Sequence, residues 1–197
     1  APGVIILTAI FTSIFGGVNT LWDRRYGFMN KALTSPISRS AIALGKMSAI
    51  SLIAALQASL IIGIALAIGV TFPNPLMIIP IMGIVILFSL GFSGISVTLA
   101  ATAKSQETFW GMINLLGMPL FMLSPALFPL ELLPNWLAVI AKLNPVTYTV
   151  LLVRELMTGV SEGGVPILLS IAVIFAFVIA MVAIASYVFT REVNKPF

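Results

Sequence analysis

Long apolar stretches, separated by short charged clusters, organise this chain of 197 residues. No charged residue occurs in 2–22, 47–103, 108–130 or 163–190, and the turn residues around Asn74 interrupt the second of these stretches. A helix needs about 20 apolar residues to cross a hydrocarbon core roughly 30 Å thick. The pattern therefore predicts an all-α integral membrane protein with one transmembrane domain over 1–197. The five expected spanning helices are at about 3–22, 46–70, 76–102, 107–127 and 166–190.

One apolar region, from Asn114 to Arg154, contains too many prolines for two ordinary spans. Each proline removes a backbone donor and clashes with the preceding helical turn. Irregular backbone is not tolerated where it faces lipid. We therefore expect this region to pack against protein or line a cavity, and we predict that it is a moving or gating part. Its prolines are Pro119, Pro125, Pro129, Pro134 and Pro145.

Composition supports the membrane assignment and narrows the chemistry. Only 8% of the residues are charged and the mean hydropathy is +1.16, whereas soluble domains average roughly 25% charged residues. The basic pI of about 9.8 is interpreted as membrane-flanking Lys and Arg rather than as a nucleic-acid surface. The sequence contains no Cys and no His, which excludes disulfides, thiol chemistry and histidine metal sites. We expect no metal site and no catalytic residue.

The distribution of Lys and Arg predicts the orientation of the chain. Basic loops stay in the cytoplasm, so we expect the C-terminus to be cytoplasmic and the N-terminus of this chain to lie outside the cell membrane. An outside N-terminus without a signal peptide predicts one further helix upstream. The basic residues are Arg24, Arg25, Lys31, Arg39 and Lys46 after the first span, Lys104 after the third, and Arg191 and Lys195 in the tail.

The expected cytoplasmic loop, 23–45, contains a short amphipathic piece with apolar residues at helical spacing. Two interpretations remain open: an interfacial helix on the lipid headgroups, or a docking element for a cytoplasmic partner. Leu44-Gly45-Lys46 resembles the end of a phosphate-binding loop. Ser40 stands where that motif needs Gly and Met47 follows the Lys, so we predict no ATP site in this chain.

Polar residues within the predicted spans form two stripes, and both have two interpretations. Thr8, Thr12, Phe15 and Asn19 share one face of the first span. The serines of the third span, Ser89, Ser93 and Ser96, share another. Such stripes favour close helix packing, with substrate contact as the alternative. The candidate substrate path consists of Thr12, Asn19, Gln57, Asn114 and Phe121.

Two motifs resemble the permease subunit of type-2 ABC exporters, the group that includes drug, polysaccharide and lipid-linked exporters. The first is Gly27…Leu33-x-Ser35-Pro36-x-Ser38-Arg39…Leu44-Gly45-Lys46. The second is Asn114…Pro119-Leu120-Phe121…Ser124-Pro125-Ala126-Leu127-Phe128-Pro129-x-x-x-Leu133-Pro134-x-Trp136-Leu137…Leu143-Asn144-Pro145-x-Thr147-Tyr148…Arg154. Family members have six spans with the N-terminus inside, so this chain resembles spans two to six. It departs from the family at Pro125, usually Gly, and at Asn30-Lys31, where a Glu is common.

The resemblance implies an exporter of two permease units and two ATPase units, with ATP and Mg bound by the partner ATPase and no cofactor in this chain. It implies a short coupling helix on the ATPase and re-entrant helices over 128–160 at the outer face. The coupling residues would be Tyr26, Gly27, Phe28, Met29, Leu33, Ser35 and Pro36. The outer gate residues would be Pro129, Pro134, Trp136, Asn144, Pro145, Tyr148 and Arg154.

The function predicted is therefore that of the membrane-spanning subunit of an ATP-driven exporter for an amphipathic or lipid-like substrate. Its expected partners are an ABC ATPase, a second copy or a paralogue, and the lipid bilayer, with no nucleic acid. No ionisable residue lies in the middle of a predicted span, which argues against ion-coupled transport. A channel-type protein or a scaffold without ATP coupling is the alternative. An intramembrane enzyme is disfavoured because the sequence offers no catalytic dyad.

Overall fold

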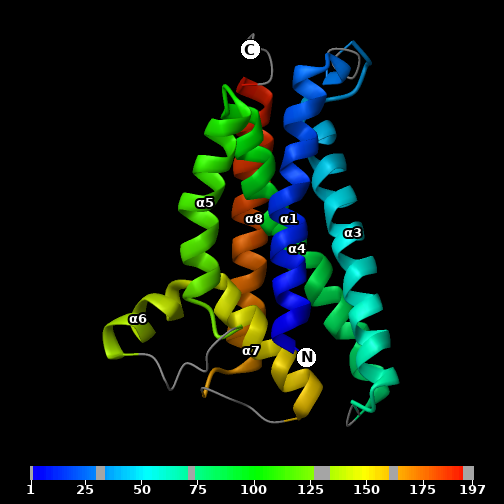
Figure 1. Cartoon of the computed structure of the whole chain (residues 1–197), viewed down its shortest axis with the longest axis vertical. Helices are drawn as coiled ribbons and strands as arrows, with labels where there is room; N and C mark the ends of the chain where they lie inside the picture. The colour runs from blue at the N-terminus through cyan, green and yellow to red at the C-terminus, as the bar shows by residue number, and fades with distance from the viewer. Residues whose placement is uncertain (1, 30–33, 71–73, 127–133, 160–163, 193–197) are drawn as a thin grey trace.

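A computed structural model describes residues 2–29, 34–70, 74–126, 134–159 and 164–192. All regular structure in these ranges is helical, which confirms the predicted all-α class. Figure 1 shows the long helices α1, α3, α4, α5 and α8 lying side by side, with α6 and α7 across the end at which the chain begins. The elements are α1 (Pro2–Arg25), α3 (Arg39–Ala67), the 3₁₀ helix η1 (Pro75–Met77), α4 (Ile78–Thr102), α5 (Gln106–Met122), α6 (Asn135–Leu143), α7 (Pro145–Thr158) and α8 (Ile167–Glu192).

Four helices, α1, α3, α4 with η1, and α8, are long and apolar enough to cross a membrane. Helix α5 has 17 residues and ends at Met122, before the predicted limit of 127. At about 1.5 Å per residue it is about 26 Å long, slightly less than the hydrocarbon core. The pair α6–α7 bends by 84° and forms either a broken span or a re-entrant loop. That each of these segments crosses the membrane stays a prediction.

The loop predicted over 23–45 is shorter than expected. Helix α1 continues to Arg25 and α3 begins at Arg39. Ser38 ends the loop because its hydroxyl accepts a hydrogen bond from the Ala41 amide at 3.3 Å, which caps α3. The connection between the two helices therefore covers 26–38.

Helix α4 is central and packs most extensively against α8, α1 and α3. Its serine stripe is fully buried. The Ser96 hydroxyl donates to the Ser13 carbonyl of α1 at 2.6 Å, and Ser51 of α3 donates to the Ile86 carbonyl of α4 at 3.0 Å. Close helix packing is thus confirmed for this stripe, since its small side chains let neighbouring backbones approach.

Helix α1 approaches α4 most closely at Gly17. A Cβ placed there would lie 2.7 Å from both the Cβ and the carbonyl oxygen of Ser96. Such contacts are far inside van der Waals distance and one of them is to backbone, so a rotamer change cannot relieve them. Gly17 therefore sets the separation of α1 and α4.

The junction between α5 and α7 depends on one buried side chain, that of Asn144. At the end of α5 the Ser124 amide bonds to the Phe121 carbonyl at 3.2 Å, which leaves the Leu120 carbonyl without its usual helical partner. The Asn144 amide group donates to that carbonyl at 2.6 Å, and its oxygen accepts from the Val146 amide at 3.0 Å. Asn144 thus caps the C-terminus of α5 and the N-terminus of α7 together.

The sharp bend between α6 and α7 follows from Pro145, which lacks the amide that would continue α6. The carbonyls at the end of α6 are satisfied instead by side chains from the first turn of α7. The Thr147 hydroxyl donates to the Ala141 carbonyl at 2.6 Å, and the Tyr148 hydroxyl donates to the Lys142 carbonyl at 2.7 Å. These bonds fix the bend, so α6 and α7 form one bent unit, which we call the bracket.

Replacing Gly17 by Ala should destabilise the bundle by about 1–3 kcal/mol, the usual cost of overpacking. Gly63→Ala in α3 is the matched control, because nothing lies within 4 Å of a Cβ at that position; it should be neutral or slightly stabilising. Thermal unfolding in detergent measures both. Equal melting temperatures for the two variants would contradict the close approach of α1 and α4.

Replacing Asn144 by Ala removes both caps and leaves a buried carbonyl unpaired, so stability should fall by about 2–3 kcal/mol. Asn74→Ala is the matched control, because the exposed Asn74 side chain caps only η1, through the Leu76 amide at 3.0 Å. That variant should lose about 1 kcal/mol or less. Chemical denaturation in mixed micelles compares them, and a larger loss in Asn74→Ala would refute the junction.

Candidate functional site

The first functional region is the coupling segment, which we define as residues 26–38 between α1 and α3. It lies at the end of the bundle where α8 finishes (Figure 1). Helix α1 ends at Arg25 and a turn follows at Tyr26 and Gly27. The φ of Gly27 is 74°, a left-handed value that favours glycine. The chain is helical again at Phe28 and Met29.

Side chains of the coupling segment divide between the exterior and the core. Tyr26 and Phe28 are exposed, at 79% and 65% respectively, whereas Met29 is only 3% exposed. The prediction that Met29 is an exposed docking residue is wrong. Adjacent residues of a helix point about 100° apart, so Phe28 faces outward while Met29 packs in a cluster with Met47 and Phe189.

The remaining predicted coupling residues have mixed positions. Ser35 is half-buried and Pro36 is exposed. Leu33 lies outside the described residues. Of the predicted coupling residues that the structure describes, Tyr26, Phe28 and Pro36 are exposed, and Gly27 is half-buried.

Polar contacts attach the base of the coupling segment to three helices. Asp23 of α1 forms an ion pair with Lys46 of α3. One guanidinium nitrogen of Arg24 donates to the carbonyls of Ala100 at 2.9 Å and Ala101 at 2.6 Å, at the end of α4. Because these carbonyls belong to the last helical turn, a cation suits them. The segment is therefore held rigidly where it joins the bundle.

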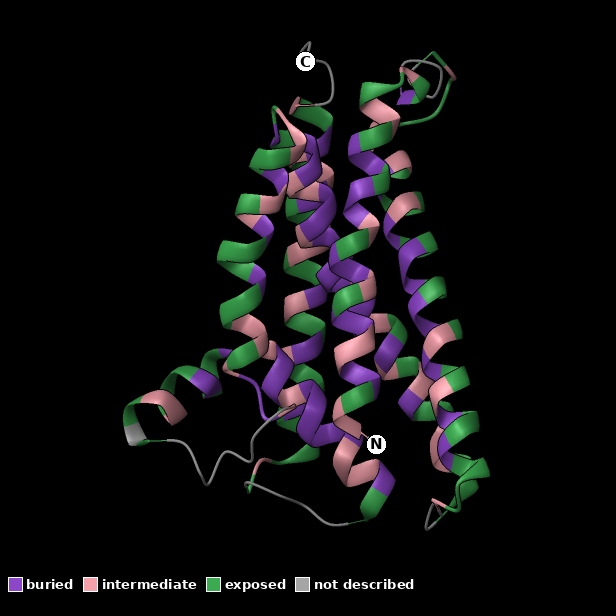
Figure 2. Cartoon of the chain, in the orientation of Figure 1, coloured by how far each residue is buried: buried purple, intermediate pink, exposed green. Residues whose placement is uncertain are grey.

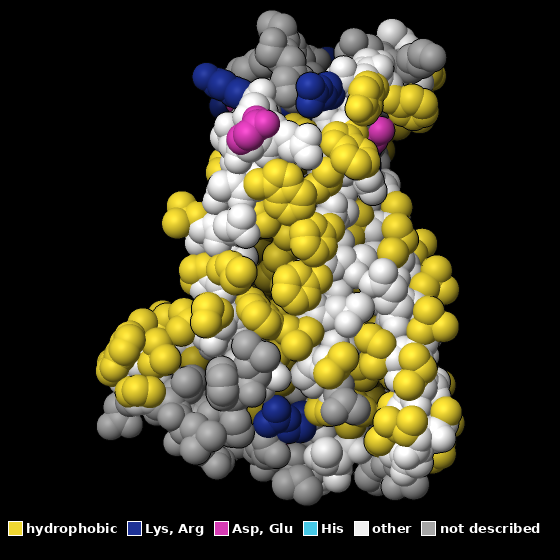
Figure 3. All heavy atoms as spheres, viewed as in Figure 1, with side chains coloured by type: hydrophobic (Ala, Val, Ile, Leu, Met, Phe, Trp, Pro, Cys, Tyr) yellow, Lys and Arg dark blue, Asp and Glu magenta, His cyan; other side chains and the backbone are white. Residues whose placement is uncertain are grey.

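Basic residues gather at this same end, which we call the coupling end. Figure 3 shows Lys and Arg side chains at both ends of the visible face, with more at the coupling end. At the opposite end the described basic residues are Lys142 and Arg154. Those at the coupling end are Arg24, Arg25, Arg39, Lys46, Lys104 and Arg191.

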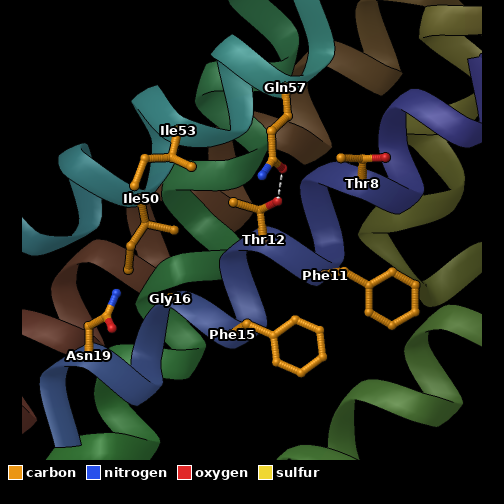
Figure 4. Close-up of a pocket in the computed structure, with 9 residues that line it drawn as sticks. All are labelled: Thr8, Phe11, Thr12, Phe15, Gly16, Asn19, Ile50, Ile53 and Gln57. Carbon is orange, nitrogen blue, oxygen red and sulfur yellow. Dashed lines mark hydrogen bonds between the residues drawn. The ribbon is translucent and has the colours of Figure 1, made fainter. Parts of the chain in front are cut away.

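The second functional region is an open groove of about 440 Å³ between α1 and α3. Figure 4 shows Thr12 of the stripe predicted on α1 pointing to Gln57 of α3, with the Thr12 hydroxyl donating to the Gln57 side-chain oxygen, whereas Phe15 points away from Gln57. Gln57 thus makes a contact across helices, as one of the two interpretations predicted. The lining residues are Thr8, Phe11, Thr12, Phe15, Gly16, Asn19, Ile50, Ile53 and Gln57.

Aromatic rings continue from this groove onto the α5 side of α1. Ring centroids of Phe11 and Phe15 are 6.0 Å apart, those of Phe11 and Phe121 are 5.5 Å apart, and those of Phe15 and Trp110 are 5.6 Å apart. We call Phe11, Phe15, Trp110 and Phe121 the aromatic column. Figure 3 shows hydrophobic side chains stacked along this face between α1 and α5.

The predicted path residues surround α1 on two sides. Thr12, Asn19 and Gln57 line the α1–α3 groove, whereas Asn114 and Phe121 line a smaller hollow between α1 and α5. Sequence reasoning missed two members of the aromatic column. Phe11 was detectable because it lies four residues before Phe15, on the same helical face. Trp110 carried no comparable signal, because only the packing of α5 on α1 shows its position.

The third region is the end opposite the coupling segment, which contains Pro125. The Arg154 guanidinium of α7 donates to the Pro125 carbonyl at 3.1 Å. A Cβ on Gly3 of α1 would lie 2.6 Å from the Ala126 carbonyl oxygen. The segment after α5 is therefore enclosed between α1 and α7, and the carbonyl of Pro125 serves as an acceptor.

Other predicted gate residues lie in this region. Asn144, Pro145 and Tyr148 form the bend between α6 and α7, while Pro134 and Trp136 are exposed at the start of α6. Pro129 lies outside the described residues. Within the described ranges no group of three His, Cys, Asp or Glu side chains could hold a metal ion.

Comparison with known proteins agrees with this arrangement. Residues 1–158 match the family model described as ABC-2 type transporter. A protein named as a transport permease, ycf38, from Cyanophora paradoxa is 31% identical over 156 residues, which cover 79% of this chain and 54% of the relative. The chain thus spans about half the length of that relative.

More distant relatives include a nodulation protein and a drug-resistance permease. Nodulation protein J of Sinorhizobium fredii is 24% identical over 179 residues, covering 89% of this chain and 67% of the relative. The daunorubicin resistance ABC transporter permease DrrB1 of Streptomyces coeruleorubidus is 24% identical over 160 residues, covering 80% and 56%. Since the family model matches most of its length, the chain belongs to the ABC-2 type transporter family, as an all-α permease domain that is itself non-catalytic.

Proposed function

We propose that this chain is the membrane-spanning subunit of an ATP-driven exporter for an amphipathic or lipid-like substrate. The observation that carries the proposal is the aromatic column between α1 and α5. Phe11 and Phe15 of the column are exposed, Trp110 and Phe121 are half-buried, and the amides of Asn19, Gln57 and Asn114 flank it. A mainly apolar surface with a few polar groups suits an amphipathic ligand. The name of the daunorubicin relative, a resistance ABC transporter permease, supports transport as the activity.

A second permease unit is the proposed neighbour of this surface. Asn19 and Asn114 are both exposed on helices that are otherwise apolar, and amides facing lipid alone are unfavourable. Figure 2 shows α5 exposed over much of its length. A second copy or a paralogue against α1 and α5 would cover these groups and enclose the path.

The coupling segment is the proposed docking site for an ABC ATPase, which would bind ATP and Mg. Tyr26 and Phe28 offer exposed aromatic rings, the residue class that dominates binding energy at interfaces. We expect the chain to lie in the cell membrane. The excess of basic residues at the coupling end supports a cytoplasmic location for that end. The N-terminus of this chain would then lie outside and α8 would end in the cytoplasm.

The bracket α6–α7 is the proposed outer gate. Asn144 ties it to the end of α5, and Arg154 ties it to the segment that follows α5. A displacement of α5 at the aromatic column would therefore be transmitted to the bracket. This connection would let the outer side respond to changes along the path.

Replacing Phe28 by Asp should uncouple ATP hydrolysis from export and reduce export at least tenfold. The reason is that an aromatic hot-spot residue contributes about 2 kcal/mol or more to the binding free energy of an interface. Phe28→Leu, which keeps an apolar side chain, should retain most activity. Co-purification with the ATPase and export in vesicles measure both. Normal export by Phe28→Asp would rule out the docking role.

Replacing Phe15 by Ala should change the KM for substrate-stimulated ATP hydrolysis by about 2–10-fold, the range for loss of an aromatic pair. Phe175→Ala on α8 is the matched control, because Phe175 is 46% exposed and Phe15 is 50% exposed. A panel of amphipathic drugs and short-chain lipids supplies the substrates. Equal effects of the two substitutions would argue against the aromatic column as the path.

The channel alternative has its own experiment. Purified permease reconstituted without an ATPase should show no ion conductance in planar bilayers. Robust conductance under those conditions would replace the exporter proposal with a channel.

A further inference from the structure

A second cavity, separate from the groove and the aromatic column, lies at the coupling end. It has a volume of about 420 Å³ and opens between the last turn of α1 and the turn that joins α4 to α5. We call it the basic cavity. Its lining residues are Leu21, Trp22, Arg24, Arg25, Lys104, Ser105, Gln106 and Glu107.

The charges of the basic cavity favour an anion. Three cationic side chains face one carboxylate, that of Glu107. The Arg25 charge lies close enough to this carboxylate to interact with it electrostatically. The first turn of α5 adds the partial positive charge of a helix N-terminus. Among the side chains that line the cavity, positive charges exceed negative charges by two. Glu192 of α8, which is not part of the lining, also interacts electrostatically with Arg24.

Two features show that these cations are arranged for a ligand. Arg24 is oriented by its bonds to the Ala100 and Ala101 carbonyls, so one wall is fixed before anything binds. Arg25 and Lys104 are exposed and form no ion pair with any other residue in the described part of the chain. Arg25 interacts electrostatically with Glu107, and the exposed ends of both basic side chains are accessible to a ligand.

The apolar part of the lining indicates which class of anion would bind in the cavity. Leu21 is buried and Trp22 is exposed in the last turns of α1, directly below the cations. Trp side chains favour the level of lipid headgroups, and basic pockets between membrane helices bind anionic headgroups. We propose that the basic cavity binds the phosphate of an anionic lipid headgroup. Its volume lies within the usual range of small-molecule pockets, about 300–1,000 Å³.

Binding here would connect the two functional regions. The cavity includes the turn of α1 that precedes Tyr26, and the turn of α5 that precedes Trp110 of the aromatic column. A bound phosphate would hold these turns at a fixed separation. The inference concerns binding alone and does not require that the proposed export take place.

The test uses Trp22 as the reporter in the purified protein, with Trp110 and Trp136 replaced by Phe. Purified protein in neutral detergent is titrated with short-chain phosphatidylglycerol, phosphatidylcholine and glycerol 3-phosphate. Phosphatidylglycerol should give a saturable change in fluorescence, and phosphatidylcholine a weaker one. Native mass spectrometry of retained lipid provides a second measurement that does not depend on fluorescence.

Variants identify the cavity as the site. Lys104→Gln should weaken phosphatidylglycerol binding about fivefold, and Arg25→Gln with Lys104→Gln roughly thirtyfold, from about 1 kcal/mol per basic residue near anionic lipid. Lys142→Gln, at the opposite end, is the matched control and should leave binding unchanged. Arg24 is left intact because it also caps α4.

Each outcome decides the proposal. Binding of phosphatidylglycerol alone supports a lipid headgroup, whereas equal binding of glycerol 3-phosphate supports the same phosphate chemistry with a soluble source. Equal binding of phosphatidylcholine and phosphatidylglycerol, the absence of saturable binding, or binding unaffected by Lys104→Gln would overturn the proposal. Export assays do not enter this test, so its failure and that of the proposed function are distinguishable.

Discussion

The need to satisfy every backbone polar group without water governs this structure. In an apolar environment a carbonyl or amide without a partner is strongly unfavourable. Regular helices meet the requirement by themselves, but α5 ends early and α6 bends sharply into α7. Side chains of Asn144, Thr147 and Tyr148 supply the missing partners at those points. The proposed gate region can therefore be irregular because polar side chains compensate for each break in the helices.

The same requirement explains the different roles of small polar residues. On α4, Ser93 and Ser96 are buried and bond to backbone carbonyls, which holds helices together. On α1, Thr12 faces an open groove and bonds to the side chain of Gln57. A similar pattern in the sequence thus yields a packing seam on one helix and an accessible polar surface on another. The difference lies in the neighbouring helix, which offers backbone carbonyls to the serines of α4 but the Gln57 side chain to Thr12.

Much of the fold follows from local signals in the sequence. Apolar length separates the long helices, Ser38 marks the start of α3, and Pro145 marks the bend. The early end of α5 was not predictable, because hydropathy continues through Pro125 without a change. The function of Pro125 as an acceptor for Arg154 depends on residues 29 positions apart. Contacts of that kind arise from tertiary packing, which spacing along the chain does not report.

In the coupling segment an exposed residue and a buried residue are direct neighbours in the sequence. Phe28 points outward, and its neighbour Met29 is packed among side chains of α3, α4 and α8. One peptide bond joins the two, and peptide bonds are planar and stiff. A displacement of Phe28 would therefore reach Met29 unless the φ and ψ angles between them change. The unbranched thioether side chain of Met29 can adapt to small shifts of its neighbours, so its contact with the bundle would persist during such a displacement.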